Sequence, residues 1–283
     1  MALLAPPGRI RTSAPTTGEA RLGRWLAFAA AAGIALAALL GVAAHVNTRP
    51  GLSAVSLTIS DFAVSDRGGP MDAAMVVLGV ASGALVAAMA TLRTPVLGVP
   101  AALLLVWSGG LITAAIVPTD PIGAAMSGSA YVHRYVSVAA FVCLPAAGAL
   151  CARRLRRDPH WTRAARGMRA LAAVSGALLA ALMYVAGPGE RVFMGLVERA
   201  LVGAEVLLVA LLAVRLIAIS RDRSSRSRSA PLPQAASPTT AIGADSRLGC
   251  RESATGSAAV QGAAYGRRDG PGGEDGPGLC LAL

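Results

Sequence analysis

Long apolar runs separated by short polar segments fill the chain between residues 25 and 218. An α-helix needs roughly 20 apolar residues to cross a bilayer, and six runs come close to that length. Prolines and glycines mark breaks between them, as at 118–121 and 187–189. The pattern predicts an all-α polytopic membrane protein, a six-transmembrane-helix bundle. The predicted spans are 25–44, 71–92, 96–117, 131–152, 170–186 and 192–214.

The two ends of the chain lack this pattern. Residues 1–24 are polar and contain prolines and arginines, and 219–283 are rich in Ser, Arg, Pro, Gly and Ala without apolar periodicity. Such segments bury too little apolar surface to offset the entropy of ordering. We therefore expect a disordered cytoplasmic lead, a membrane domain at 25–218, and a disordered low-complexity tail.

The first span is longer than the 7 to 15 apolar residues of a signal peptide. Its end, Val42-Ala43-Ala44, nevertheless resembles a cleavage site. Removal of this span is the alternative, and it would leave five spans.

The charge pattern orients the bundle. The charged fraction is 14%, below the roughly 25% of a soluble domain, and the net charge is +11 with all 26 basic residues being Arg. These arginines cluster beside alternate ends of the spans, as the positive-inside rule requires, which favours a membrane protein over a nucleic-acid-binding one. Both termini are predicted to be cytoplasmic. Arg in place of Lys, with much Ala, Gly and Pro, is typical of a GC-rich bacterial genome, so we expect a bacterial plasma (cell) membrane.

The polar segment between spans four and five is the most basic part of the chain. It contains seven arginines from Arg153 to Arg169. Arginines near a bilayer surface gain about 1 kcal/mol each from anionic lipid headgroups. We therefore expect the lipid bilayer and its anionic headgroups as partners, and no nucleic acid.

The segment before span two is unusually apolar for an outer loop. Leu57, Ile59 and Phe62 interrupt its polar residues. We expect it to lie back against the mouth of the bundle.

Polar residues gather in the outer half of the predicted bundle. Arg191, Glu198 and Glu205 are seven apart and so would share one stripe of span six, and Glu205 would lie roughly 14 Å from Leu196, near the bilayer midplane. Gly195 and Gly203 leave room for Arg199 to reach a partner such as Asp120. The cluster indicates a polar path or an outward cavity for a ligand or proton, or else interhelical bonds that lock the bundle. Its members are Asp61, Asp120, His133, Arg191, Glu198, Arg199 and Glu205.

Three of these residues are candidates for catalysis. Asp120, His133 and Glu198 could surround a metal ion or a water molecule, but a metal site needs about three protein ligands. Four cysteines without a CxxC pair support neither a disulfide framework nor a zinc knuckle. There is no HExxH motif, nucleophile elbow or phosphate-binding glycine loop. No metal site and no cofactor are predicted.

Four short motifs resemble a known family. They are SLTISDFAV in the first outer loop, PTDP after span three, HR at the start of span four, and ERVF before span six. Over roughly residues 25 to 218 they are similar to the domain of unknown function 998 family of bacterial and archaeal integral membrane proteins. The resemblance implies a six-helix membrane protein of uncharacterised role and directs attention to Ser60, Asp61, Asp120, His133 and Arg191.

Three functions are consistent with these features. The first is a non-enzymatic small transport, permeation or envelope-accessory protein. The second is a membrane-embedded hydrolase of a lipid or envelope substrate, and the third is a purely structural membrane subunit. The absence of a recognisable catalytic motif favours the first.

Overall fold

The computed structural model describes residues 15–46, 53–65, 69–121 and 124–228, which all lie in the first of two units of the chain, Met1–Pro231. Regular secondary structure in these residues is helical only, which confirms the predicted all-α class. Six helices are long and apolar enough to cross a membrane, so the protein is a multi-pass integral membrane protein. The helices are α1 (Thr17–Val46), α2 (Ile59–Ser65), α3 (Pro70–Thr91), α4 (Val99–Ile116), α5 (Gly128–Leu155), α6 (Thr162–Ala186) and α7 (Met194–Arg228).

Several helices extend beyond the predicted apolar spans. Helix α6 begins at Thr162 rather than at 170, and its first turns bury Ala164, Ala165 and Met168 while the neighbouring arginines stay exposed. Arginine is a good helix former, so a polar turn ends the apolar span without ending the helix. The division of the chain into lead, membrane domain and tail stays a prediction, and residues 1–14 and 229–283 lie outside the described part.

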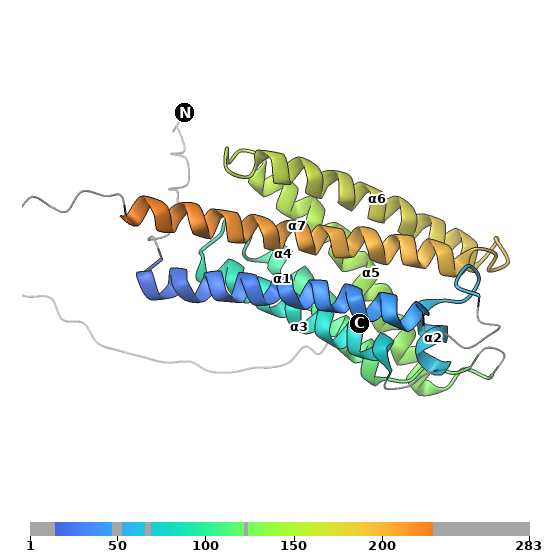
Figure 1. The fold of residues 1–283 in the computed structure, drawn as a ribbon. Helices are drawn as coiled ribbons and strands as arrows, with labels where there is room; N and C mark the ends of the chain where they lie inside the picture. Colours follow the sequence, from blue (N-terminus) through green and yellow to red (C-terminus); the bar gives the residue numbers. More distant parts are fainter. Residues whose placement is uncertain (1–14, 47–52, 66–68, 122–123, 229–283) are drawn as a thin grey trace, which may run out of the picture. The chain divides into compact units, whose positions relative to one another are not determined.

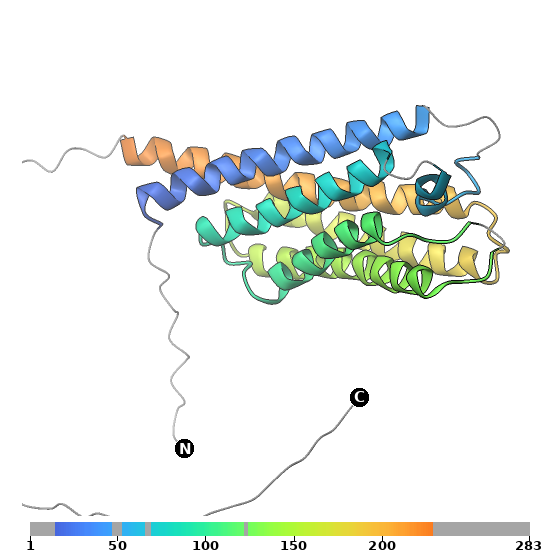
Figure 2. The same ribbon diagram turned by 90° about the horizontal axis from the view of Figure 1, so that it is seen from below.

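The six long helices form a closed ring. Each packs against its neighbour in the order α1, α3, α4, α5, α6 and α7, and α7 returns to α1. Figures 1 and 2 show these helices running side by side, with each one antiparallel to the next along the chain. The short helix α2 contacts α3 and α7 at one end of the ring. We call this the α2 end and the opposite end, which carries most of the arginines, the Arg-rich end.

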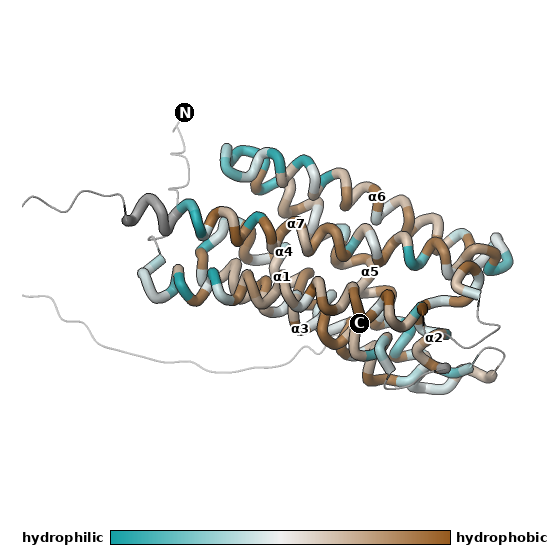
Figure 3. Tube along the Cα trace, viewed as in Figure 1, coloured by the Kyte–Doolittle hydropathy of each residue, from teal (hydrophilic) through white to brown (hydrophobic). Residues whose placement is uncertain are grey.

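Large apolar side chains fill the half of the ring nearer the Arg-rich end. Lipid tails are as apolar as leucine, so helices associate in a bilayer through close packing and interhelical hydrogen bonds. Gly148 permits such packing, because a Cβ there would collide with Leu208 of α7. Figure 3 shows the apolar residues along the middle of the long helices. Fully buried residues in this half include Leu85, Met89, Leu92, Leu104, Leu144, Leu155, Met168, Leu208, Leu212 and Leu216.

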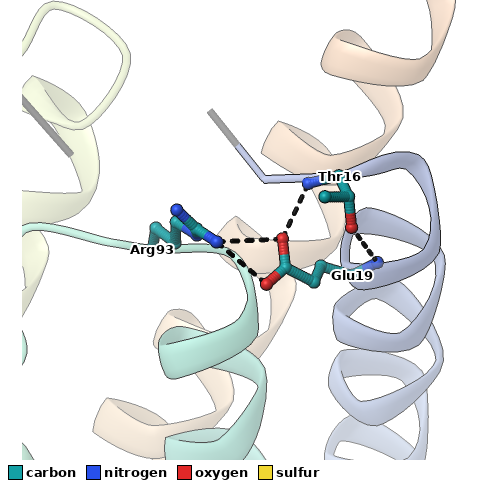
Figure 4. A network of polar contacts seen from close by, with 3 residues as sticks. All are labelled: Thr16, Glu19 and Arg93. Carbon is teal, nitrogen blue, oxygen red and sulfur yellow. Dashed lines mark hydrogen bonds and ion pairs between the residues drawn. The ribbon is translucent and has the colours of Figure 1, made fainter. Parts of the chain in front are cut away.

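An ion pair ties two helices together at the Arg-rich end (Figure 4). The Nη2 of Arg93, in the turn after α3, lies 2.9 Å from Glu19 Oε1 in the first turn of α1. The other oxygen of Glu19 accepts a hydrogen bond from the Thr16 backbone N–H at 2.7 Å. The start of α1 is thereby held against the turn between α3 and α4.

Helix α2 is the part of the first loop that folds back on the bundle, as its apolar residues predicted. The backbone N–H of Thr58 donates to Asp61 Oδ2 at 2.8 Å, and the N–H of Asp61 donates to Thr58 Oγ1 at 3.1 Å. This reciprocal pair is a capping box that starts the helix. Phe62 is buried beneath it. Just before α2, the carbonyl of Val55 accepts from the N–H of Leu196 in α7 at 3.0 Å.

Candidate ligand-binding cavity

The half of the ring at the α2 end encloses a cavity of about 710 Å³. Small-molecule sites in proteins span roughly 300–1,000 Å³, so this cavity is large enough for one. All helices except α6 contribute to its lining. Most of the lining is apolar, and the polar groups come from the part of each helix nearest α2. These polar residues are His45, Ser60, His133, Ser137, Glu198 and Arg199.

Small side chains explain why this half of the ring is hollow. Every long helix that lines the cavity presents at least one Ala or Gly to it, although Met, Leu and Phe side chains also take part in the lining. Residues as small as Ala and Gly do not reach the centre of the ring of six helices. The helices cannot move closer to fill it, because each is already in contact with its neighbours. The small lining residues are Ala37, Ala38, Gly41, Ala74, Gly110, Ala114, Ala140 and Gly203.

Arg199 is fixed at the polar end of the cavity by neutral groups. Its Nε donates to His45 Nε2 at 2.7 Å, and its Nη1 donates to the carbonyls of Leu57 at 2.7 Å and Gly195 at 2.9 Å. Its Cζ also lies 4.7 Å from the centroid of the Phe62 ring, a cation–π contact. Because a carbonyl only accepts, the 2.6 Å contact from His45 Nδ1 to the Gly41 carbonyl places the proton on Nδ1 and leaves Nε2 to accept from Arg199.

One donor of Arg199 has no protein partner. Its Nη2 is buried and makes no hydrogen bond with any residue that the structure describes. No carboxylate in the described ranges forms an ion pair with this guanidinium. A buried donor without a partner is costly, and more so when it is charged. Arg199 thus places a positive charge in the cavity lining, while its Nη2 is covered by other atoms.

Glu198, which precedes Arg199 in α7, holds the start of α2. Its Oε2 accepts a hydrogen bond from the backbone N–H of Ile59 at 2.8 Å, and the residue is 6% exposed. Ile59 is the first residue of α2, so its N–H has no partner within that helix. The carboxylate supplies that partner across the cavity mouth.

His133 joins α5 to both α4 and α2. Its Nδ1 lies 2.9 Å from the carbonyl of Val117, at the end of α4, and its Nε2 lies 3.1 Å from Ser60 Oγ. The carbonyl again requires a proton on Nδ1, and in the neutral imidazole Nε2 then accepts from the Ser60 hydroxyl. His133 is 5% exposed. Ser60 and His133 therefore form a hydrogen-bonded pair that lines the cavity.

The structure separates three of the predicted site residues from the cavity. The prediction that Arg199 reaches Asp120 is wrong, because Asp120 accepts instead from the Ser127 N–H at 2.5 Å and from Ser127 Oγ at 3.0 Å. Asp61 is used in the capping box of α2. Arg191 is exposed in the turn before α7 with φ of 63°, so it does not continue the stripe of Glu198 on that helix.

Gly195 leaves room for Arg199, as its position suggested, and also for the backbone before α2. A Cβ at this residue would collide with the carbonyl of Leu57 and would lie 2.8 Å from the Nη1 of Arg199. The space that glycine leaves at this position is therefore shared by the backbone segment before α2 and the Arg199 side chain. Gly203, by contrast, has nothing within 4 Å of an added Cβ and lines the cavity.

Glu205 is buried in the bundle but does not line the cavity. It is 0% exposed, and neither of its carboxyl oxygens has a hydrogen-bond partner among the described residues. Its neighbours Val206 and Val202 do line the cavity. Glu205 thus lies beside the cavity wall, on the side of α7 that faces the packed interior.

The candidate catalytic residues do not assemble into a metal centre. Within the described ranges, no group of three or more His, Cys, Asp or Glu side chains could hold a metal ion. Of the three candidates, His133 and Glu198 share the cavity and Asp120 does not. His45 was not predicted as a site residue, and Ser60 was indicated only by the resemblance. The helical spacing of Ala and Gly residues, which puts them on the sides of the helices that face the ring interior, was the sequence signal that could have located the cavity.

Comparison with known proteins identifies the family. The family model described as Protein of unknown function (DUF998) matches residues 11–215. The chain belongs to the DUF998 family. No curated protein and no solved structure is similar enough to match. The match covers all six long helices of this DUF998 protein up to Arg215 and includes every cavity-lining residue.

Proposed function

We propose that this protein binds an amphipathic molecule with an apolar body and one anionic head in its intramembrane cavity, as a small carrier or envelope-accessory protein. The observation that carries the proposal is Arg199, a cation in the lining at the polar end of a mostly apolar cavity. A carboxylate or phosphate head at this end would be attracted by that positive charge. The apolar walls would surround the apolar body.

Glu198 limits the kind of head group that fits. Its Oε2 accepts from the Ile59 N–H, so one of its two oxygens is already used at the polar end. Arg199 carries the charge that an anionic head would offset. An anionic head is favoured over a cationic one for this reason.

The head group is tested with two probes of equal chain length, hexadecanoate with an anionic head and hexadecan-1-ol with a neutral one. Equilibrium binding of each radiolabelled probe is measured on the detergent-solubilised full chain. A hydrogen bond to a charged group contributes about 1.5–3 kcal/mol, so the parent should prefer hexadecanoate by about 10- to 150-fold. Arg199→Gln should remove the preference and leave hexadecan-1-ol binding unchanged, while Glu198→Gln should keep the preference.

A cavity-filling variant provides the second arm. Gly203→Leu adds a side chain where a Cβ meets nothing within 4 Å, so it should fold normally and weaken both probes. Failure of the parent to bind either probe would overturn the proposal. So would a preference for hexadecanoate that survives Arg199→Gln, or binding that is unaffected by Gly203→Leu.

We also propose that the protein resides in a bacterial plasma membrane with its Arg-rich end in the cytoplasm. Support comes from the arginines at that end, which follow the positive-inside rule. In this orientation the polar end of the cavity lies nearer the outer face. Residues Arg153, Arg157, Arg163, Arg166 and Arg169 are exposed there and would contact anionic headgroups.

A further inference from the structure

The hydrogen bond between Ser60 and His133 has the arrangement of a nucleophile and its general base. We propose that Ser60 cleaves a long-chain acyl ester held in the cavity, with His133 as the base. This inference rests on the proposed function, because the ester must occupy the same cavity as the amphipathic ligand. It adds an activity, acyl transfer from an ester to a serine hydroxyl and then to water.

The His133 tautomer is the one that this reaction requires. The Val117 carbonyl holds the proton on Nδ1, so the lone pair of Nε2 faces the hydroxyl of Ser60 at 3.1 Å. A general base must lie within hydrogen-bond reach of the proton that it removes, about 2.6–3.2 Å. A third group that orients the base completes the usual arrangement of an activated serine. A backbone carbonyl takes that position in this protein.

The backbone on either side of Ser60 is also fixed. The capping box joins Thr58 to Asp61, and the N–H of Ile59 is bound by Glu198. His133 is 5% exposed and uses both ring nitrogens. A site held in this way loses little entropy when the reacting groups align.

The chemical step balances with groups that line the cavity. Ser60 Oγ attacks the acyl carbon while its proton passes to His133 Nε2, and the carbonyl oxygen becomes negative. The alcohol leaves with the proton from Nε2, which gives an acyl ester of Ser60. Water then attacks this ester, with Nε2 taking its proton and returning it to Ser60 Oγ. The products are one alcohol and one carboxylic acid.

Arg199 brings a positive charge to the lining of the same cavity. Its Nη1 holds the carbonyl of Leu57, three residues before Ser60 in the chain. Negative charge develops on the acyl oxygen in the transition state and remains on the carboxylate product. A preorganised positive charge nearby stabilises such negative charge. The apolar walls suit the acyl chain, and this makes a long-chain ester the class of substrate.

The test uses an alkyl fluorophosphonate, which forms a covalent bond with activated serines, on the purified full chain in detergent. Peptide mass analysis should place the label on Ser60. Ser60→Ala should remove the label, and His133→Gln should slow labelling and the hydrolysis of p-nitrophenyl laurate by about 10²- to 10⁴-fold, the usual contribution of a general base. Ser129→Ala is the matched control, one helical turn before His133 and outside the cavity lining, and it should react like the parent.

Binding of hexadecan-1-ol is measured on every variant to show that the cavity is intact. A parent that binds this probe but is not labelled at Ser60 would refute the inference and leave the proposed function standing. Turnover that persists in Ser60→Ala would also refute it. A parent that binds no probe would refute both proposals together.

Discussion

Glu205 offers the sharpest test of how the described residues are packed. The residue is completely buried in α7, and both carboxyl oxygens lack a hydrogen-bond partner in the described part of the chain. Methionine has a side chain of similar length without the polar oxygens. We expect Glu205→Met to stabilise the protein, because it removes an unsatisfied polar group and leaves no hole.

The size of the effect follows from the desolvation of that group. A buried donor or acceptor without a partner costs about 1–3 kcal/mol. A volume-conserving apolar replacement costs less than about 1.5 kcal/mol. The net gain in the free energy of unfolding should therefore reach about 1–2 kcal/mol.

Glu198→Met is the matched control with the opposite sign. Its carboxylate accepts from the Ile59 N–H, so the substitution leaves that N–H without a partner and should cost about 1–3 kcal/mol. The two positions are seven residues, about 10.5 Å, apart on one helix. Their effects should add within about 0.5 kcal/mol in the double variant.

Unfolding is followed by circular dichroism during titration of the solubilised protein with sodium dodecyl sulfate. The reasoning is refuted if Glu205→Met lowers the free energy of unfolding by more than about 1 kcal/mol, because Glu205 would then make a stabilising contact. Equal stabilisation by both substitutions would also contradict it.

Three further predictions concern packing, topology and metal content. A Cβ at Gly79 would lie 2.8 Å from the Ser108 carbonyl, so Gly79→Ala should cost about 1–3 kcal/mol in the same unfolding assay. Gly109→Ala, where a Cβ meets nothing within 4 Å, should be neutral or stabilising by up to about 1 kcal/mol. A phosphatase reporter fused after Arg169 should be inactive because it stays in the cytoplasm, and an active fusion would reverse the topology. Elemental analysis of untagged protein should find no stoichiometric transition metal, and metal that disappears in His133→Ala would contradict this.

The helices could be predicted because each apolar run is long and is interrupted by proline or glycine. Pro118 ends α4 close to the predicted position, at Ile116. Helix α6 begins about two turns before the predicted apolar span, because the polar arginine-bearing residues end the apolar span but continue the helical hydrogen bonding. The folded-back segment before span two was predicted from Leu57, Ile59 and Phe62. Its capping box between Thr58 and Asp61 was not predicted.

The contacts of the site were harder to predict. The spacing of Glu198 and Glu205 on one helix was read correctly, but the helix begins only at Met194, which removes Arg191 from the stripe. Arg199 was expected to reach a partner such as Asp120 in the room left by Gly195 and Gly203. The structure gives it His45 and two carbonyls instead. A sequence shows which charges exist but not which neutral acceptors the ring brings closer.

Because one half of the ring is packed and the other is hollow, the two halves of each helix should tolerate amino-acid substitutions differently. Substitutions among the close-packed leucines at the Arg-rich end change many contacts at once and so lower the yield of folded protein. At the α2 end, a change among Ala38, Ala114 and Gly203 reshapes the space available to a guest molecule while breaking few contacts. Related sequences can therefore come to bind different ligands without first gaining extra stability. A library randomised at those three positions is the natural starting point for changing which ligand binds.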